Sequence, residues 1–160
     1  MLKTLTNIKV YHTSEVLLRY KDILRRLLKP LKIKITYHDP CDLGRHSEIT
    51  EEPRLLIRLI PDIKFLELPL NRYRSTCCGG GGLLMIHSME LSTEVAKEKW
   101  LREIEPLEVD YVVTACPTCY KNLQYGAIKA GKEPRVLDIS QLLLSSIKGI
   151  GPRKLIELWW

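Results

Sequence analysis

The stretch YVVTACPTCYKNLQYGAIKA, residues 111–130, predicts a buried strand that runs through two cysteines into a helix. Its first five residues, 111–115, have the apolar and β-branched composition of a strand that is covered on both faces. The rest is helical, and Pro117 suits the first helical position. Cys116 therefore lies near the helix cap and Cys119 in the first turn. The N-terminal end of a helix lowers the pKa of a thiol and favours the thiolate, which is the form that binds metal.

Short β-type runs alternate with helical periods along the rest of the chain. Such alternation implies right-handed βαβ crossovers and a mostly parallel sheet that is covered on both faces. We therefore expect a single Rossmann-like α/β domain. The expected strands are 8–12, 32–38, 63–68, 111–115 and 135–139. The first expected helix is capped by Ser14 and ended by Pro30, and its apolar stripe consists of Val16, Tyr20, Ile23, Leu24, Leu27 and Leu28. Further helices are expected at 51–60, 86–104, 117–130 and 140–147.

The sequence GIGP interrupts this pattern near the C-terminus. We place a boundary there, with the domain at residues 1–148 and a C-terminal helical tail at residues 149–160. The segment IKGIGPRKLIEL (147–158) resembles the helix-hairpin-helix motif, whose glycine hairpin contacts DNA phosphates through backbone N–H groups. Leu155 stands where that motif has a small residue, and the sequence holds one copy. We expect the tail to be a terminal helix packed on the domain, and DNA binding stays an alternative that we do not expect.

The composition is that of an ordinary globular domain. The chain has 160 residues, and 45% of them are hydrophobic. It contains no apolar stretch of the length that spans a membrane, and MLKTLTNIKVYH does not have the pattern of a secretory signal. We therefore expect a cytoplasmic protein. In that compartment five cysteines favour a metal or redox site over structural disulfides, and an odd number cannot all pair within the chain.

The net charge of +6 is concentrated near the N-terminus. Residues 1–34 hold nine Lys or Arg against Glu15 and Asp22, whereas residues 35–160 hold sixteen against seventeen acidic residues. A basic segment of this kind can face an acidic protein, a nucleic acid or an anionic membrane surface. A solvated helix face explains it equally well.

The cysteines follow three of the expected strands. Cys41 comes after the strand that ends at His38, the pair Cys77 and Cys78 comes after the third strand, and Cys116 follows the strand quoted above. The carboxyl ends of parallel strands meet at one edge of a sheet, which is where open α/β folds bind their ligands. Cys119 follows Cys116 by three residues and so lies at the same place. The sequence therefore predicts that all five cysteines gather at this edge.

The residues around the cysteines predict a metal centre but do not identify the metal. The adjacent pair is followed by four glycines: Gly79, Gly80, Gly81 and Gly82. A glycine run can turn several backbone N–H groups toward anionic sulfur, and such hydrogen bonds raise the reduction potential of an iron–sulfur centre. Zinc and an ordinary cubane cluster each take four ligands, whereas five thiolates suit either a less regular cluster or four ligands with one exchangeable thiol. An iron–sulfur centre, a zinc site and a purely redox-active thiol site of the CPTC kind therefore all stay open.

Three polar residues flank the first cysteine. His38, Asp39 and His46 can support the metal ligands or donate protons at the centre. They can equally serve to cap the turn between the strand and the next helix.

The spacing C-x35-C-C-x37-C-x2-C, with the neighbours of each cysteine, resembles the cysteine-rich CCG domain. That domain occurs in heterodisulfide reductase and in the iron–sulfur subunits of glycolate oxidase and anaerobic glycerol-3-phosphate dehydrogenase. The resemblance covers roughly residues 8–145. It is carried by YHDPCDLGRH (37–46), EEPRLLIRLIP (most closely 52–61), CCGGGG (77–82) and TACPTCYKNL (114–123).

The resemblance implies a noncubane 4Fe–4S cluster and an oxidoreductase function. The implied cluster ligands are Cys41, Cys77, Cys78, Cys116 and Cys119. The chain would then be an iron–sulfur subunit that carries electrons to a disulfide or cleaves it reductively. Because some CCG domains bind zinc or have a structural role, a zinc-binding or structural assembly module is the leading alternative.

This sequence departs from the family pattern in three ways. It holds one CCG copy in place of two, it has no ferredoxin-type cysteine motif, and Asp42 stands where the family commonly has histidine. The first two differences imply a subunit of a larger oxidoreductase complex that is not active alone. The expected partner is a second CCG-containing or ferredoxin-like protein, which also offers a route to peripheral membrane attachment. The third difference weakens any role of this copy in handling a substrate proton.

Overall fold

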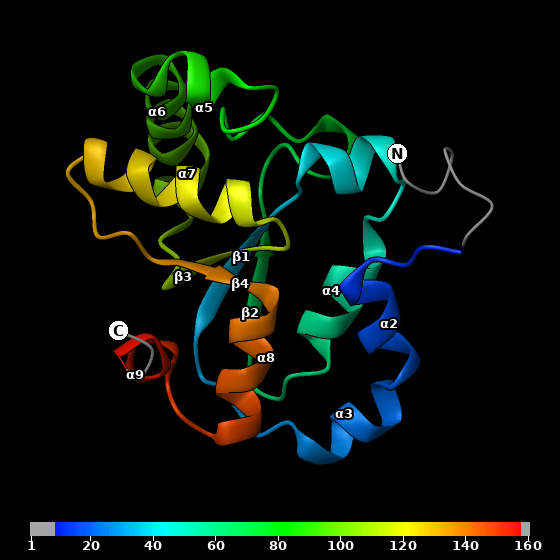
Figure 1. Ribbon diagram of the computed structural model, residues 1–160. Helices are drawn as coiled ribbons and strands as arrows, with labels where there is room; N and C mark the ends of the chain where they lie inside the picture. The colour runs from blue at the N-terminus through cyan, green and yellow to red at the C-terminus, as the bar shows by residue number, and fades with distance from the viewer. Residues whose placement is uncertain (1–8, 158–160) are drawn as a thin grey trace.

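Four parallel strands form the centre of the molecule. The computed structural model describes residues 9–157 (Figure 1). The strands are β1 (Lys34–His38), β2 (Lys64–Glu67), β3 (Tyr111–Thr114) and β4 (Val136–Asp138), in the spatial order β2-β1-β3-β4. All three neighbouring pairs are parallel. The expected Rossmann-like α/β domain with a parallel sheet is confirmed.

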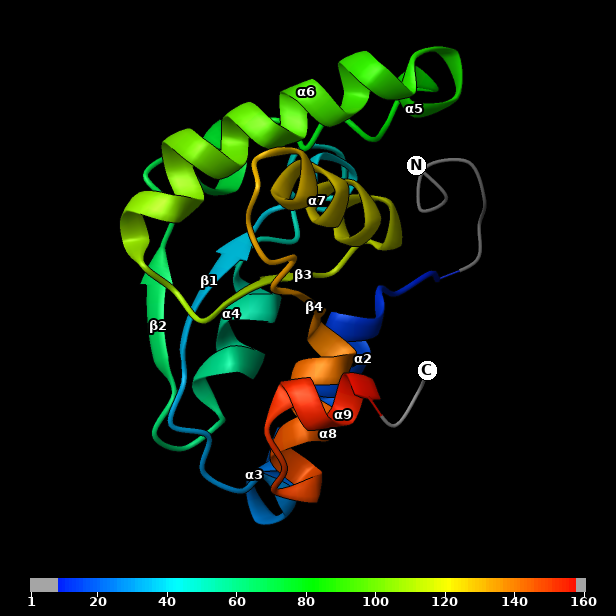
Figure 2. The ribbon, with the colours of Figure 1, turned by 90° about the vertical axis from the view of Figure 1, so that its left-hand side faces the viewer.

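Helices cover both faces of this sheet. The α-helices are α2 (Thr13–Arg19), α3 (Lys21–Leu27), α4 (Glu51–Arg58), α5 (Leu84–His87), α6 (Met89–Lys99), α7 (Pro117–Lys129), α8 (Ile139–Lys148) and α9 (Pro152–Glu157). The short helical turns are η1 (Asp42–His46), η2 (Arg72–Arg74), η3 (Trp100–Ile104) and η4 (Glu105–Leu107). In Figure 2, α6 and α7 lie on one side of the strands, and α2, α3, α4 and α8 lie on the other. The expected helices at 51–60, 117–130 and 140–147 are confirmed with small shifts at their ends.

Alternating side chains of the strands supply two separate hydrophobic cores. Ile35 and Tyr37 of β1 belong to the core beneath α2, α3, α4 and α8. Val112 of β3 belongs to the opposite core, beneath α7 and the turns that follow α6. Gly126 allows close packing on that side, because a Cβ atom there would lie 2.6 Å from the backbone of Ala96 in α6. Both faces of the short sheet are therefore buried, as a parallel sheet requires.

The order of the strands creates a topological switch point between β1 and β3. From β1 the chain passes through α4 to β2 at one edge, and then crosses the other face through α6 to reach β3 on the far side of β1. His38 and Thr114, at the carboxyl ends of β1 and β3, are partners in the register. Ligand sites of open α/β sheets form at such a point.

The N-terminal segment differs from its prediction. Residue 8 lies outside the described residues, and residues 9–12 form no strand. The backbone N–H of His12 donates instead to Glu15 Oε2 at 2.7 Å, and the His12 ring accepts from the backbone N–H of Ser14. This capping box satisfies the backbone N–H groups of His12 and Ser14, which in a strand would have donated to a neighbouring strand. His12, not Ser14, therefore caps the first helix.

The first helix is also divided in two. It breaks at Tyr20, between α2 and α3. Leu24 and Leu28 are buried in the core, as the stripe predicts. The other four members of the stripe are between 39% and 57% exposed: Val16, Tyr20, Ile23 and Leu27. The expected helix at 86–104 is divided as well, because Ser88 ends α5 and its side chain caps α6 through the N–H of Leu91 at 3.3 Å.

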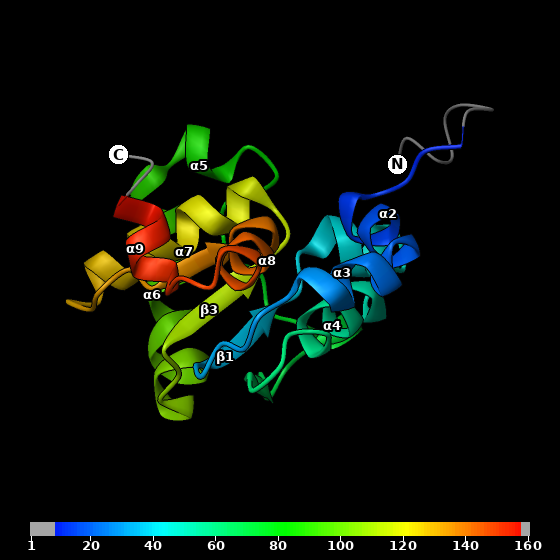
Figure 3. The same ribbon diagram turned by 90° about the horizontal axis from the view of Figure 1, so that it is seen from below.

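The C-terminal tail lies against the domain. Gly149, with φ +69°, ends α8, and α9 follows beside α8 (Figure 3). Leu155 is buried, which agrees with a terminal helix packed on the domain. The boundary after residue 148 and the DNA-binding alternative stay predictions from the sequence. Within residues 9–157, every helix falls short of the length and apolarity needed to cross a membrane.

Candidate metal centre

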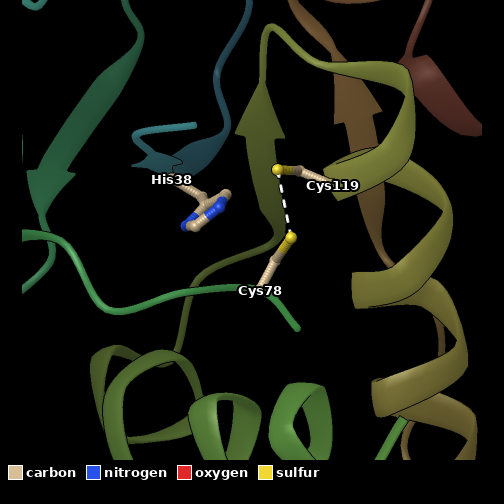
Figure 4. Close-up of side chains that lie close together, drawn as sticks. All are labelled: His38, Cys78 and Cys119. Atoms are coloured by element: carbon tan, nitrogen blue, oxygen red, sulfur yellow. Dashed lines mark hydrogen bonds between the residues drawn. The ribbon is translucent and has the colours of Figure 1, made fainter. Parts of the chain in front are cut away.

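Three loops bring the five cysteines to the carboxyl edge of the sheet. Cys41 follows β1, Cys116 follows β3, and Cys119 lies in the first turn of α7. Cys77 and Cys78 lie in the loop that returns from β2 through η2. The sulfur atoms of Cys78 and Cys119 are 3.2 Å apart (Figure 4).

Four of the five thiols, those of Cys116, Cys119, Cys78 and Cys77, form a series of neighbours, and Cys41 lies further from them. Cys116 interacts with Cys119, Cys119 with Cys78, and Cys78 with Cys77. Cys77 in turn interacts electrostatically with Cys41. Cys78 and Cys119 are buried, Cys41 and Cys116 are half-buried, and Cys77 is exposed. The group thus has two sulfurs at its base and opens toward the surface.

Neighbouring groups set the charge of these sulfurs. The pKa of Cys116 is lowered to about 6, mainly because the Cys119 thiol donates toward its sulfur, and the backbone N–H groups of Cys119 and Thr118 add to the effect. The pKa of Cys78 is lowered because the thiols of Cys119 and Cys77 and the His38 ring all stabilise its thiolate. The pKa values of Cys119 and Cys77 are raised correspondingly, first by these same hydrogen bonds and then by burial. Two sulfurs are therefore ready to bind a metal as thiolates.

The first two glycines shape the loop around the adjacent cysteines. The backbone N–H of Gly79 donates to Cys77 Sγ at 3.2 Å, and that of Gly80 donates to Cys78 Sγ at 3.4 Å. Gly79 has φ +80°, and a Cβ atom there would lie 2.6 Å from the backbone oxygen of Ser92. A Cβ atom at Gly81 would meet open space. Gly82 likewise has open space around it, so close approach requires glycine at the first two positions and not at the last two.

A polar pair that sequence reasoning missed holds this loop between α6 and α7. The Asn122 amide donates to the backbone oxygen of Cys78 at 2.5 Å and to that of Ser92 at 3.0 Å. The Ser92 hydroxyl donates to the backbone oxygen of Gly79 at 2.8 Å. Both side chains are fully buried. Their signal in the sequence is weak, because each is one buried polar residue on a helix that carries several other polar residues.

A buried ion pair joins the first and second cysteine loops. Arg54, from α4, donates to the two carboxylate oxygens of Asp39 at 2.6 and 2.7 Å and also reaches Glu67 at 2.8 Å. Asp39 accepts from the backbone N–H of Arg72 at 2.8 Å, and its own backbone oxygen accepts from the Ser75 hydroxyl at 3.2 Å. Arg54 is 0% exposed. Asp39 therefore positions the loops and does not point at the thiols.

The two histidines predicted near the first cysteine have different surroundings. His38 is buried, and one of its ring nitrogens lies within 4.8 Å of the sulfurs of Cys78 and Cys119 (Figure 4). Burial lowers the pKa of His38 and favours the neutral ring. His46 is at the end of η1. Within residues 9–157, it does not belong to the group of possible metal ligands formed by His38, Cys78 and Cys119.

A cavity of about 480 Å³ opens beside Cys116. Cys116 and Pro117 line one side of it, and Ile49 belongs to another wall. Residues 10–12, which precede α2, also line the cavity. Most of the lining is apolar, and Asp42 adds a carboxylate.

Comparison with known protein families identifies this arrangement. The model of the cysteine-rich (CCG) domain matches residues 35–124, which is more than half of the chain and contains all five cysteines. The chain belongs to this family, as the resemblance of its motifs predicted.

Several curated proteins are similar to the chain over most of its length. One subunit of the dihydromethanophenazine:CoB–CoM heterodisulfide reductase of Methanosarcina barkeri is 32% identical over 119 residues, which is 74% of this chain and 29% of that protein. One subunit of the CoM/CoB fumarate reductase of Methanothermobacter marburgensis is 34% identical over 72% of this chain and 23% of its own length. A probable iron–sulfur-binding oxidoreductase of Bacillus subtilis is 33% identical over 88% of this chain and 20% of its own length. The chain thus spans between a fifth and a third of these relatives.

The residues present fit the iron–sulfur cluster that the family implies. The donor set is rich in thiols, and two of the sulfurs accept backbone N–H groups of the glycine loop. Thiolates are the usual ligands of iron–sulfur clusters, and hydrogen bonds to their sulfurs tune them. The buried His38 ring also faces the sulfurs of Cys78 and Cys119, and neither ring nitrogen makes a regular hydrogen bond among the described residues. Each of these features suits a group that binds between the loops.

Replacing Arg54 should lower the stability of the folded protein strongly. Arg54→Met leaves the Asp39 carboxylate buried without its partner, so we expect a loss of about 3–5 kcal/mol in the free energy of unfolding. Arg54→Lys should recover part of this loss, since a single ammonium cannot bridge both carboxylates. Arg58→Met is the matched control on the same helix, because the Arg58 side chain is 52% exposed. Urea unfolding under anaerobic conditions measures all three, and equal losses for Arg54→Met and Arg58→Met would refute the positioning role of Arg54.

Two glycine variants test whether the loop needs glycine for close packing against α6 or for flexibility of its backbone. Gly79→Ala puts a Cβ atom against Ser92 and strains a positive φ, so we expect a stability loss of about 1–3 kcal/mol and a marked fall in bound metal. Gly81→Ala enters open space and should change stability by less than about 0.5 kcal/mol. Thermal unfolding and metal analysis of both variants test this. A Gly81→Ala defect as large as that of Gly79→Ala would show that the loop needs flexibility along its whole length.

Proposed function

We propose that this chain is the iron–sulfur subunit of a heterodisulfide-reductase-like oxidoreductase. In this proposal Cys41, Cys77, Cys78, Cys116 and Cys119 hold a noncubane 4Fe–4S cluster. The observation that carries the proposal is that the loops after three parallel strands bring all five cysteines to the carboxyl edge of the sheet, with the Cys78 and Cys119 sulfurs 3.2 Å apart. Family membership and the iron–sulfur relatives support it.

Each part of the site has a task in this proposal. Cys78 and Cys119 hold the buried side of the cluster, and Cys77, Cys41 and Cys116 hold its more open side. Two adjacent cysteines crowd a single metal ion but can bind different irons of a cluster, which favours a multi-iron centre. When bound, such a cluster supplies one-electron transfer. The N–H groups of Gly79 and Gly80 offset the negative charge of the sulfurs.

The proposed reaction is the reductive cleavage of a disulfide. It consumes two electrons and two protons and releases two thiols: R–S–S–R′ + 2e⁻ + 2H⁺ → RSH + R′SH. The cavity beside Cys116 supports this proposal, because it has room for one arm of a small disulfide next to the cysteines. Its largely apolar lining favours an uncharged arm. The electrons come from a redox partner protein.

A partner protein is the second part of the proposal. Two of the relatives are named as subunits of reductases, and such names indicate assemblies with further chains. On this chain the exposed stripe Val16, Tyr20, Ile23 and Leu27 lies among basic residues of α2 and α3, which supports docking of an acidic partner with an apolar contact. We expect the partner to be a second CCG-containing or ferredoxin-like protein, held by contacts that salt weakens. Full disulfide reduction by the isolated chain with a small-molecule donor would refute this part.

A zinc-binding assembly module is the second candidate. The observation that favours it is the group His38, Cys78 and Cys119, whose possible ligand atoms all lie within 4.8 Å of one another. One histidine and two or three thiolates make a common structural zinc site. In this alternative the more exposed Cys77 and Cys41 are dispensable.

Serine substitutions of the individual cysteines distinguish the two candidates. Serine is close to cysteine in size but a much poorer ligand for iron, so each of the five variants should lose iron or change the electron paramagnetic resonance (EPR) signal of the reduced protein. Cys77→Ser and Cys41→Ser are decisive, since the zinc alternative predicts no effect for them. Anaerobically reconstituted protein is compared for iron, sulfide and EPR signal. Either variant with full iron, full sulfide and an unchanged signal would disprove the five-ligand assignment.

A further inference from the structure

The ring nitrogens of His38 make no regular hydrogen bond within the described part of the protein, although the ring faces the Cys78 sulfur and helps to lower the pKa of that thiol. It is 1% exposed and lies at the carboxyl end of β1, directed toward the sulfurs of Cys78 and Cys119 (Figure 4). Both ring nitrogens are buried, and neither makes a hydrogen bond to any residue in the described part of the chain. Buried polar groups in native proteins are nearly always hydrogen-bonded, so this ring calls for a hydrogen-bond partner on the side that it faces.

The polar groups around His38 are already occupied. The buried Lys99 ammonium binds the Thr76 hydroxyl at 2.7 Å and the Glu103 carboxylate at 2.9 Å. The Asp39 carboxylate is bound by Arg54, and the Thr114 hydroxyl donates to the backbone oxygen of His38 and not to its ring. The sulfurs are the groups left facing the imidazole.

We propose that the His38 ring donates an N–H hydrogen bond to a sulfur of the metal centre at the position of Cys78, and that it tunes the reduction potential of the cluster. This inference rests on the proposed iron–sulfur function. The Cys78 sulfur has capacity for such a donor, because a thiolate sulfur has several lone pairs and the N–H of Gly80 at 3.4 Å occupies one of them. Five thiolates already supply the ligands of the cluster, so His38 acts as a donor to sulfur and not as a ligand of iron. It is a positioning and tuning residue.

The direction of the effect follows from electrostatics. Reduction adds negative charge to the cluster and its sulfurs, and an N–H donor stabilises that charge. Loss of the donor therefore disfavours the reduced state. We expect His38→Leu to shift the equilibrium between reduced and oxidised cluster about tenfold toward the oxidised form, which for a one-electron couple is a fall of about 59 mV.

Three variants test this in the full-length, anaerobically reconstituted protein. His38→Leu removes the donor, His38→Gln keeps an N–H donor of similar reach, and His87→Leu is the control at an exposed histidine in α5. Redox titration followed by EPR should give a lowered potential for His38→Leu, a nearly unchanged potential for His38→Gln, and the original potential for His87→Leu. Equal potentials in all three variants would overturn the inference.

A second measurement begins with the unaltered protein and uses one variant only to assign the signal. Pulsed EPR of the reduced protein should reveal an exchangeable proton that is lost in deuterated water, and a weak nitrogen coupling when histidine is labelled with ¹⁵N. His38→Gln should remove that nitrogen coupling. A strong coupling typical of a nitrogen bound to iron, or the absence of both couplings, would overturn the inference. Protein that binds zinc and no iron would overturn the proposed function itself, whereas iron-loaded protein without these effects would overturn the role of His38 alone.

Discussion

The parallel pairing of β1 with β3 is the constraint on which the rest of the site depends. It sets His38 opposite Thr114, so that the chain leaves both strands at the same edge and on either side of the switch point. Cys41 and Cys116 then emerge at the same edge although 74 residues separate them in the sequence. Because β2 pairs parallel with β1, its exit brings the adjacent cysteines to the same edge. A different register or an antiparallel strand would scatter the thiols.

Buried polar contacts then fix the loops that the sheet brings together. Asp39 links the first loop to the second through the backbone of Arg72 and the hydroxyl of Ser75, and Arg54 balances its charge. Asn122 links the second loop to α7, which carries the third. All three cysteine loops are thereby joined through groups that are not themselves metal ligands. Burying a paired charge contributes little net stability, so the ion pair is best understood as a device that specifies the position of the loops.

Local pattern was enough to predict the parallel sheet and the edge at which the cysteines gather. The strand 111–115 and the helix after Pro117 were predicted from composition and a helix-start signal, both of which act over a few residues. The prediction was wrong for residues 9–12, where a capping box at His12 replaced a strand. The role of Arg54 was missed because its partners Asp39 and Glu67 lie 15 and 13 residues away in the sequence. Periodicity carries no information about such partners, nor about which of two apolar faces on α2 and α3 the core will cover.

One chain with these five thiols should hold one iron–sulfur cluster. Determination of iron, acid-labile sulfide and zinc per chain, on the full-length protein reconstituted and kept without oxygen, tests it most directly. We expect about four irons and four sulfides per chain, with zinc far below one equivalent. One equivalent of zinc, with neither iron nor sulfide retained, would refute the iron–sulfur assignment and identify a closed structural metal site.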